Sequence, residues 1–393
     1  RAIVTSIAAC ALAVGWIGAS GASARPASSE PSAAHYIVVL HDDVDPEAAA
    51  RDHGRRYGAQ VERVYHNALK GYVATFKGTG AADVAQDPRV DFVELDQKVT
   101  VQTTQTIGTG DSWGLDRIDQ RSLPLSHSYT YLADGTGVTA YIIDTGIMSS
   151  HAEFGGRVAS DPNRFDAIGD GRNGEDCAGH GTHVAGTVGG TNYGVAKHVT
   201  LVSVRVLDCA GSGSYAGVIA GVDWVTGNHA AGAPAVANMS LGGPTSSALD
   251  AAINNSINDG VTYVVAAGNG NQAGVGQDAC RFSPARVSNA ITIGAVDQND
   301  KKTPWSNFGK CVDWFAPGLD IVSAGIANDT DSETMSGTSM ASPHTAGVVA
   351  LYLDTFPTSA PIDVRNALAT LTTKNVVGSA GKGSPNALLF TNL

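Results

Sequence analysis

Short runs of apolar residues recur along the chain after residue 113, with stretches of mixed polarity between them. The runs are Val138–Ile143, Val199–Val206, Val236–Met239, Val261–Ala266 and Ala290–Val296. Such near-continuous runs are typical of parallel strands that are buried on both faces. The mixed stretches predict helices at His183–Gly189, Ala216–Asn228, Leu249–Asp259 and Ser339–Tyr352. The alternation predicts an α/β unit with one mainly parallel sheet and helices on both of its faces.

A smaller unit with a different pattern precedes this one. Strands are predicted at His35–Leu40, Val61–Tyr65, Gly71–Phe76 and Val90–Leu95, and helices at Asp45–Tyr57 and Gly80–Gln86. Their order, β-α-β-β-α-β, is that of the ferredoxin-like split βαβ fold, an α+β arrangement. Residues 97–112 are mostly polar, and we expect them to form an exposed linker that proteases can cut.

The N-terminal residues and the charge balance bear on where the protein acts. An apolar run, Ala2–Ile17, is followed by small residues ending in Ala22-Ser23-Ala24, the pattern of a cleaved signal peptide. We expect residues 1–24 to be this signal and the protein to be secreted, free of the membrane once the signal is removed. A retained membrane anchor is the alternative. The formal net charge of −12 disfavours nucleic acid and anionic membranes as partners.

Five cysteines are present, and Cys10 would leave with the signal peptide. The remaining four are Cys177, Cys209, Cys280 and Cys311. An even number of cysteines in an exported chain favours disulfides over buried free thiols. Four cysteines allow three connectivities, and their spacing does not choose among them.

Three residues with catalytic chemistry occupy distinctive places in the pattern. Asp144 ends the first apolar run, His180 stands between two glycines, and Ser339 precedes a predicted helix. Taken singly, each has a structural interpretation: a turn or cap for the aspartate, a structural or metal-binding role for the histidine, and an N-cap for the serine. The zinc pattern His-Glu-x-x-His is absent, and Ala341 breaks the Gly-x-Ser-x-Gly elbow of α/β-hydrolases.

In combination these residues indicate nucleophilic catalysis. The chain order Asp, His, Ser on a parallel α/β sheet is that of the subtilisin triad. Three segments together resemble the signatures of the subtilisin-like serine protease family, peptidase S8: Asp144-Thr-Gly-Ile, His180-Gly-Thr-His-Val-Ala-Gly and Gly337-Thr-Ser-Met-Ala-Ser-Pro-His. The resemblance extends from about Trp113 to the end of the chain, and the proteinase K and aqualysin-like branch is the most similar.

The resemblance implies the subtilisin-like three-layer fold for residues 104–393 and a role for each motif. Ser339 would attack the peptide carbonyl, His180 would take and return its proton, and Asp144 would orient the imidazole. Taken alone, Asn269 in Gly-Asn-Gly would be interpreted as a turn residue. In the family its amide would join the backbone N–H of Ser339 in an oxyanion hole. No catalytic metal is implied.

The resemblance also implies a groove for extended polypeptide substrates. Two segments would pair with the substrate backbone as an added strand: Gly211-Ser212-Gly213-Ser-Tyr215 and Ser240-Leu241-Gly242-Gly243. Gly242 and Gly268 would line the P1 pocket, whose bare backbone walls favour large apolar or aromatic side chains, and Ala267 would be a further substrate-binding residue. The alternative is that these glycines are ordinary loop residues.

Residues 25–103 resemble the inhibitor I9-type propeptide of the same family. Such a unit would assist the folding of a slowly forming parallel sheet, block the cleft and be cut by Ser339 between Thr100 and Ile107. An independent binding domain is the alternative. For the whole chain, which we expect to be monomeric, the other interpretations are a catalytically inactive binding protein, an esterase or lipase with the same triad, and a metal-dependent hydrolase.

Disulfide pairing is implied by the resemblance, and calcium binding by the resemblance together with the acidic charge of the chain. It implies the bridges Cys177–Cys209 and Cys280–Cys311, and structural calcium held by oxygen ligands. One calcium site would comprise Asp313 and the carbonyls of Pro284 and Arg286. A second would comprise Asp116, Asp119 and Gln120, with Ser126 and Ser128 where some relatives have Asp and Asn. A third candidate set, for which an acidic surface loop is the alternative, is Asp170, Glu175 and Asp176.

Overall fold

The computed structural model describes residues 35–66, 70–95, 103–108 and 112–393. The predicted signal peptide, residues 1–24, and most of the predicted linker lie outside these ranges. The chain divides into two compact units between Val99 and Thr100. Within the described ranges, no helix has the length and apolar character that a membrane span requires.

The smaller unit is a four-stranded antiparallel sheet with two helices. Its elements are β1 (His35–Leu40), α1 (Pro46–Tyr57), β2 (Gln60–Tyr65), β3 (Gly71–Thr75), α2 (Gly80–Val84) and β4 (Val90–Leu95). The Asp45 side chain accepts from the N–H groups of Glu47 and Ala48, and thereby caps α1 where Pro46 begins it. The core includes Val38, Leu40, Ala49, Ala50 and Val84. The sheet order β2-β3-β1-β4 confirms the predicted ferredoxin-like fold.

The larger unit is built on a nine-stranded sheet in the order β18-β19-β15-β14-β12-β10-β7-β9-β8. The strands are β7 (Thr139–Asp144), β8 (Phe165–Asp166), β9 (Thr200–Arg205), β10 (Ala235–Met239), β12 (Thr262–Ala266), β14 (Ile291–Val296), β15 (Trp314–Pro317), β18 (Thr373–Lys374) and β19 (Ala387–Leu388). Neighbouring strands run parallel except for β18 and β19. The mainly parallel sheet is therefore confirmed, and the predicted apolar runs supply its consecutive strands β14, β12, β10, β7 and β9.

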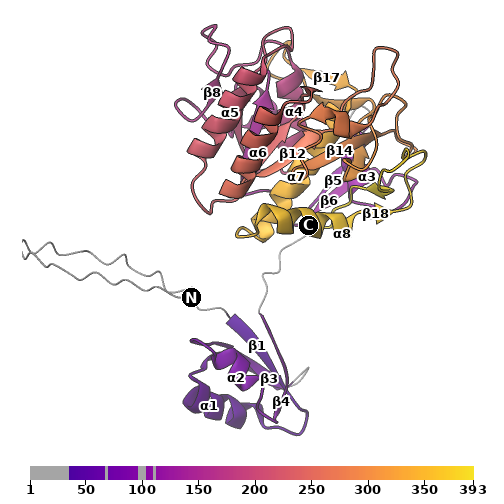
Figure 1. The fold of residues 1–393 in the computed structure, drawn as a ribbon. Helices are drawn as coiled ribbons and strands as arrows, with labels where there is room; N and C mark the ends of the chain where they lie inside the picture. The colour runs from indigo at the N-terminus through magenta and orange to yellow at the C-terminus, as the bar shows by residue number, and fades with distance from the viewer. Residues whose placement is uncertain (1–34, 67–69, 96–102, 109–111) are drawn as a thin grey trace, which may run out of the picture. The chain divides into compact units, whose positions relative to one another are not determined.

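Helices cover both faces of this sheet, which confirms the predicted three-layer arrangement (Figure 1). The helices are α3 (Trp113–Ile118), α4 (His180–Gly189), α5 (Tyr215–Asn228), α6 (Ser247–Asp259), α7 (Thr338–Thr355) and α8 (Pro361–Leu371). In β7, Ala140 and Ile142 join the core beneath α4 and α7, whereas Tyr141 and Ile143 join the core beneath α5 and α6. Because both faces are covered, the end of the strand is where a catalytic side chain can meet solvent.

Short two-stranded sheets and single turns of 3-10 helix complete the described part of this unit. The sheets pair β5 (Thr103–Thr106) with β6 (Ser128–Tyr131), β11 (Gly243–Pro244) with β13 (Phe282–Ser283), and β16 (Ile321–Ala324) with β17 (Ser332–Met335). The turns are η1 (Ala152–Phe154) and η2 (Ala279–Arg281).

The expectation of an exposed linker is wrong for residues 103–107. β5 pairs antiparallel with β6, and Ile107 is buried in the core beneath α4 and α7. The nearly buried Lys197 donates to Gln105 Oε1 at 2.6 Å, and Gln105 Nε2 donates to the Asn192 carbonyl at 2.9 Å. The polar side chain of Gln105 is thus satisfied by hydrogen bonds to distant residues, which composition alone does not reveal.

Candidate active site

Asp144 and His180 form a hydrogen-bonded pair at the end of β7. Asp144 is fully buried, and its Oδ1 lies 2.7 Å from Nδ1 of His180 and accepts from the N–H of Thr145 at 2.7 Å. His180 is the first residue of α4, and its side chain is 30% exposed. Gly179 before it has φ +92°, a left-handed conformation that favours glycine. The imidazole is therefore held by a buried carboxylate on one side and reaches solvent on the other.

The electrostatics of this pair favour the charged imidazole. Burial by itself lowers the pKa of His180, but the charge of Asp144, its hydrogen bond and the charge of Asp176 outweigh burial. The result is a pKa of His180 above the ordinary histidine value. A raised pKa makes the neutral ring a stronger base, which favours its acceptance of a proton from a neighbouring hydroxyl.

Ser339 is the second residue of α7, and the Ser240 segment holds it in place. Its Oγ donates to the Ser240 carbonyl at 3.1 Å, and Ser240 Oγ donates to the Ser339 carbonyl at 2.7 Å. Pro343, four residues on in α7, has no N–H to offer the Ser339 carbonyl, so that carbonyl is open to Ser240. Among the described residues, the Ser339 hydroxyl thus bonds to Ser240 rather than to His180.

Asn269 follows β12 and faces the start of α7. Its Oδ1 accepts from Thr338 N at 2.8 Å and from Thr338 Oγ1 at 2.9 Å. A Cβ built on Gly337 would lie 3.3 Å from Asn269 Nδ2, so the amide nitrogen lies beside the backbone that leads into Ser339. Because its oxygen is engaged, the exposed Asn269 presents N–H donors next to the serine.

Two adjoining cavities share the segment Ser240–Pro244 as a common wall. The larger, ≈ 720 Å³, is bordered by His180 and by 211–215, and the smaller, ≈ 310 Å³, by 266–270 and Ser339. Every residue that was predicted to bind substrate borders one or both of these cavities: Gly211, Ser212, Gly213, Tyr215, Ser240, Leu241, Gly242, Ala267 and Gly268.

Asn307 is a cleft residue that the sequence analysis missed. It borders the smaller cavity and is nearly buried. Its Nδ2 donates to the Ala267 carbonyl at 2.7 Å, and its Oδ1 accepts from the N–H groups of Gly270 and Gln277. A Cβ on Gly268 would lie 2.5 Å from Asn307 Nδ2, so this wall requires a glycine. An asparagine in a loop carries no signal that would have singled it out.

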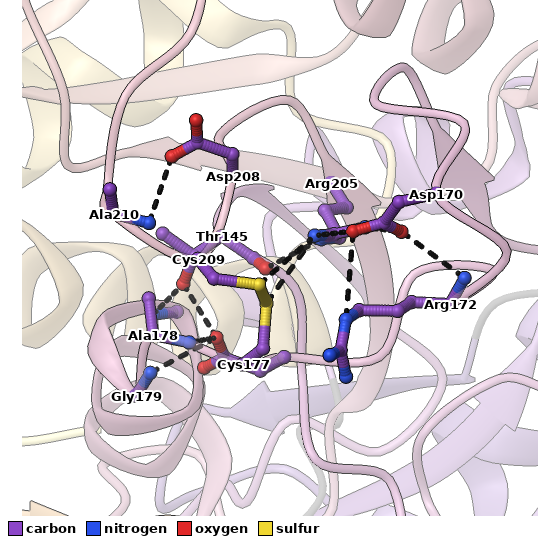
Figure 2. Close-up of a disulfide and its surroundings, with 12 residues drawn as sticks. Thr145, Asp170, Arg172, Cys177, Ala178, Gly179, Arg205, Asp208, Cys209 and Ala210 are labelled. Carbon is purple, nitrogen blue, oxygen red and sulfur yellow. Dashed lines mark hydrogen bonds and ion pairs between the residues drawn. A yellow bond between two sulfur atoms is a disulfide. The ribbon is translucent and has the colours of Figure 1, made fainter.

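Both expected disulfides are formed, Cys177–Cys209 and Cys280–Cys311. The first joins the loop before His180 to the segment before Gly211. Figure 2 shows the buried Arg205 between this bridge and Asp170. Arg205 donates to both Asp170 oxygens, at 2.6 and 2.8 Å, and its Nη2 lies 3.4 Å from Cys177 Sγ. The bridge and the ion pair together tie the histidine loop to a wall of the larger cavity.

The Asp313 set does not fit a bound calcium ion in the described geometry. Asp313 Oδ1 accepts from Arg365 at 3.0 Å through Nε and 2.5 Å through Nη2, and Oδ2 accepts from Thr292 N at 2.8 Å. The Pro284 carbonyl accepts from the N–H of Val287. The Arg365 guanidinium already supplies the positive charge that this carboxylate requires.

The second set fits a cation better. Asp119 Oδ1 is buried and has no hydrogen-bond partner among the described residues. Burial, reinforced by the nearby charge of Asp116, raises the pKa of Asp119 to about 6. Gln120 Oε1 and Asp116 Oδ1 both accept from the N–H of Ser126. These oxygens suit calcium, which would compensate the unpartnered carboxylate oxygen.

The third set separates in the structure. Asp170 pairs with Arg205 and Glu175 pairs with Arg164, whereas Asp176 accepts from backbone N–H groups. In the described part of the chain, no three acidic, histidine or cysteine side chains are grouped to hold a metal. These residues form neither the expected calcium site nor an acidic surface loop without partners, because each carboxylate has its own structural partner.

Both units of the chain match known protein families. Residues 135–387 match the subtilase family of peptidases, and residues 35–102 match the peptidase inhibitor I9 family. The chain is 55% identical to an extracellular serine proteinase of Thermus sp. (strain Rt41A) over 334 residues, 85% of this chain and 78% of that protein. It is 48% identical to alkaline serine exoprotease A of Vibrio alginolyticus over 338 residues, 85% of this chain and 61% of that longer protein.

A solved structure is similar as well. The crystal structure of a cold adapted subtilisin-like serine proteinase matches with a TM-score of 0.68 and 49% identity, and covers 72% of this chain and 99% of that one. Fold and relatives define a serine-type endopeptidase that is preceded by an inhibitor-like unit. The chain belongs to the subtilase family, peptidase S8.

Proposed function

We propose that this chain is the precursor of a secreted endopeptidase whose catalytic triad is Ser339, His180 and Asp144. The observation that carries the proposal is the 2.7 Å hydrogen bond between His180 Nδ1 and the buried Asp144, beside two adjoining cavities of which His180 borders the larger and Ser339 the smaller. The match to extracellular serine proteinases supports secretion, with residues 1–24 as the signal.

The reaction begins when Ser339 Oγ leaves the Ser240 carbonyl and gives its proton to His180 Nε2. Oγ then bonds to the peptide carbonyl carbon. The C–N bond breaks as the imidazolium protonates the leaving amine, and an acyl-enzyme remains. A water molecule then gives a proton to His180 and adds its oxygen to the acyl carbon; the bond from that carbon to Ser339 Oγ breaks as the imidazolium returns the proton to Oγ, which releases the acid and restores Ser339. Asp144 keeps the ring proton on Nδ1 and stabilises the imidazolium throughout.

The oxyanion of each tetrahedral intermediate is bound by Asn269 Nδ2 and the backbone N–H of Ser339. The support is the engagement of Asn269 Oδ1 by Thr338, which leaves only N–H donors facing the serine. Donors fixed before the reaction stabilise the developing charge without reorganisation at the moment of transfer.

Substrate specificity follows from the two cavities. The backbone of 211–215 and of 240–243 pairs with an extended polypeptide, and the smaller cavity takes the P1 side chain. Its ≈ 310 Å³ and its borders at Gly242, Ala267 and Gly268 give room for an apolar or aromatic group.

The smaller unit is the propeptide, which assists folding, inhibits the enzyme and is removed by it. We divide the precursor into residues 1–24, 25–103 and 104–393, and expect a monomeric mature enzyme. The boundary drawn from the sequence, after residue 103, falls inside β5, and a cut there would remove Thr103, which pairs with Tyr131 of β6. We therefore favour a cut on the N-terminal side of Thr103, still within the expected range. Calcium bound by Asp116, Asp119 and Gln120 would stabilise the fold without entering the reaction.

The deciding experiment is Ser339→Ala in a protease-free host. We expect a chain without peptidase activity that keeps its prosegment covalently attached, whereas wild type matures. Normal maturation of the variant would disprove self-cleavage. Failure of wild type to mature would favour an inactive binding protein. Faster turnover of a long-chain ester than of a peptide anilide would favour an esterase.

A further inference from the structure

Asp176 lies four residues before His180 and accepts hydrogen bonds from the start of α4. Its Oδ1 accepts from the N–H groups of Ala178 at 2.9 Å and Gly179 at 3.1 Å. Its Oδ2 accepts from Thr182 N at 2.9 Å and Thr182 Oγ1 at 2.6 Å. The carboxylate thus holds both the loop that precedes His180 and the turn that follows it.

The same carboxylate is joined to the residue that follows Asp144. Thr145 Oγ1 donates to Asp176 Oδ1 at 2.9 Å and accepts from the N–H of Gly181 at 2.8 Å. The neighbours of the acid and of the base are therefore linked through one hydroxyl and one carboxylate. Figure 2 shows Ala178 and Gly179 on one side of the Cys177–Cys209 bridge and Asp170 on the other, and the Thr145 carbonyl accepts from Arg205 Nε at 3.2 Å.

Two glycines allow β7 and α4 to approach this closely. A Cβ on Gly181 would lie 2.2 Å from the Gly146 carbonyl oxygen. A Cβ on Gly146, which has φ +114°, would lie 2.9 Å from the N–H nitrogen of Asp176. The backbones of β7 and α4 are in contact here, so no free space is left to accommodate a small displacement of Asp176. Such a displacement would therefore move α4 relative to β7.

We propose that Asp176 is a positioning residue for the triad, which fixes His180 against Asp144 through Thr145 and adds a second carboxylate near the imidazolium. This inference rests on the proposed function and names a residue outside the triad. Asp176 does not touch the reacting atoms. It acts through the backbone of α4 and through its charge.

The charged and titratable groups around His180 come from several elements. Asp144 lies on β7, and Glu333 on β17 has its Oε2 3.6 Å from a Cβ built on Gly179. Burial lowers the pKa of His183, one turn along α4, to about 4, so this ring stays neutral while His180 titrates. Other charged or titratable groups on the elements packed against α4 include Glu153 on η1, Arg205 on β9 and His344 on α7, with Tyr352 and Asp354 farther along α7. Asp144 and then Asp176 are the carboxylates that raise the pKa of His180.

The test compares Asp176→Asn, Thr145→Val, the double variant and wild type as mature enzymes on a peptide anilide. Asp161→Asn is the matched control, because this exposed carboxylate in the same region pairs with Arg164 and touches neither β7 nor α4. We expect Asp176→Asn to lower kcat by roughly 10–100-fold with little change in KM, since small misplacements of catalytic groups have effects of this size.

The pH profile separates positioning from a merely structural role. Loss of the Asp176 charge destabilises the imidazolium, so the acidic limb of kcat/KM should move to lower pH in Asp176→Asn. Asp161→Asn should move neither the limb nor kcat. The two test substitutions should be less than additive in kcat, because each breaks the same link.

A wild-type kcat and an unmoved limb in Asp176→Asn would overturn the proposal, as would a lower Tm with unchanged kinetics. If Asp176→Asn does not yield folded enzyme, Thr145→Val decides, because it breaks the link and keeps every charge. A wild-type kcat in that variant refutes positioning. Residual peptidase activity in Ser339→Ala would instead refute the proposed function, so the two failures are distinguishable.

Discussion

Asp144, which is fully buried, and Asp313, which is partly buried, are carboxylates whose partners differ in kind. Asp144 is bonded to an imidazole that can lose its charge, whereas Asp313 is bonded to the guanidinium of Arg365, which remains charged at any relevant pH. The first pair can carry a proton to and from a substrate, and the second can only neutralise charge. The titratable partner therefore distinguishes Asp144, the proposed catalytic aspartate, from Asp313.

The raised pKa of His180 predicts the pH dependence of the enzyme. Only the neutral imidazole accepts the Ser339 proton, so kcat/KM should fall as pH decreases through this pKa. The acidic limb should lie above the ordinary histidine value, because the Asp144 carboxylate favours the charged ring. A pH–rate profile on a peptide anilide measures the limb, and a limb below that of free histidine would contradict the assignment.

Asn269 offers a second test at this scale. Asn269→Ala should lower kcat by about 10²–10³-fold, the magnitude known for the corresponding donor of subtilisin, with KM little changed. Asn269→Asp keeps an oxygen for Thr338 and loses the donor, so it should lose comparable activity while its Tm stays closer to wild type. Steady-state kinetics and thermal melting separate the effects. An active Asp variant would show that the amide N–H is not used.

At the scale of elements, apolar runs predicted the central strands but not the edges of the sheet. β8, β18 and β19 are two residues long, and β15 has four residues, the last of which is a proline. These strands are too short to show a hydrophobic pattern that distinguishes a strand from a loop. Helix α4 begins three residues before its apolar stretch, because Asp176 and Gly179 rather than hydrophobicity determine its start. The three motifs on which the proposed triad rests could be identified in the sequence. Partners such as Arg365, which meets Asp313 from 52 residues away, were not.

The two disulfides should differ in what their removal changes. Each closes a loop of about thirty residues, so replacing either pair by serine should cost roughly 3–4 kcal/mol of stability. Cys209 also borders the larger cavity, so the Cys177→Ser/Cys209→Ser variant should raise KM for long peptides. The Cys280→Ser/Cys311→Ser variant is the control, because its sulfurs border neither cavity. Equal KM values in the two variants would contradict the link to substrate binding.

At the scale of the whole molecule, a net charge of −12 accompanies buried carboxylates whose charge must be compensated. The folded-state pKa of Asp119, about 6, lies above its usual value of 3.8. Without a cation, this residue therefore lowers stability progressively as pH rises from about 4 to about 6, and the full penalty remains above that. Calcium at this carboxylate would offset the penalty at neutral pH.

Chelation should therefore lower the Tm at neutral pH and leave kcat measured well below the Tm unchanged. In chelator, Asp119→Asn should melt higher than wild type, by roughly 2–4 °C for each kcal/mol regained, and its Tm should no longer depend on calcium. Asp313→Asn should keep the calcium dependence of wild type. Thermal melting with and without calcium measures both. A calcium response that survives Asp119→Asn and disappears in Asp313→Asn would assign the ion to the other set.

The wall Ser240–Pro244 faces both cavities, and this sharing limits how the enzyme can be redesigned. A new side chain at Leu241 changes the shape of two hollows at once. A substitution in this wall therefore changes the selectivity for the substrate residue in one cavity together with the selectivity for the residues in the other. An engineer who wants to retune them separately must work from the outer borders, near Tyr215 for one hollow and Asn307 for the other.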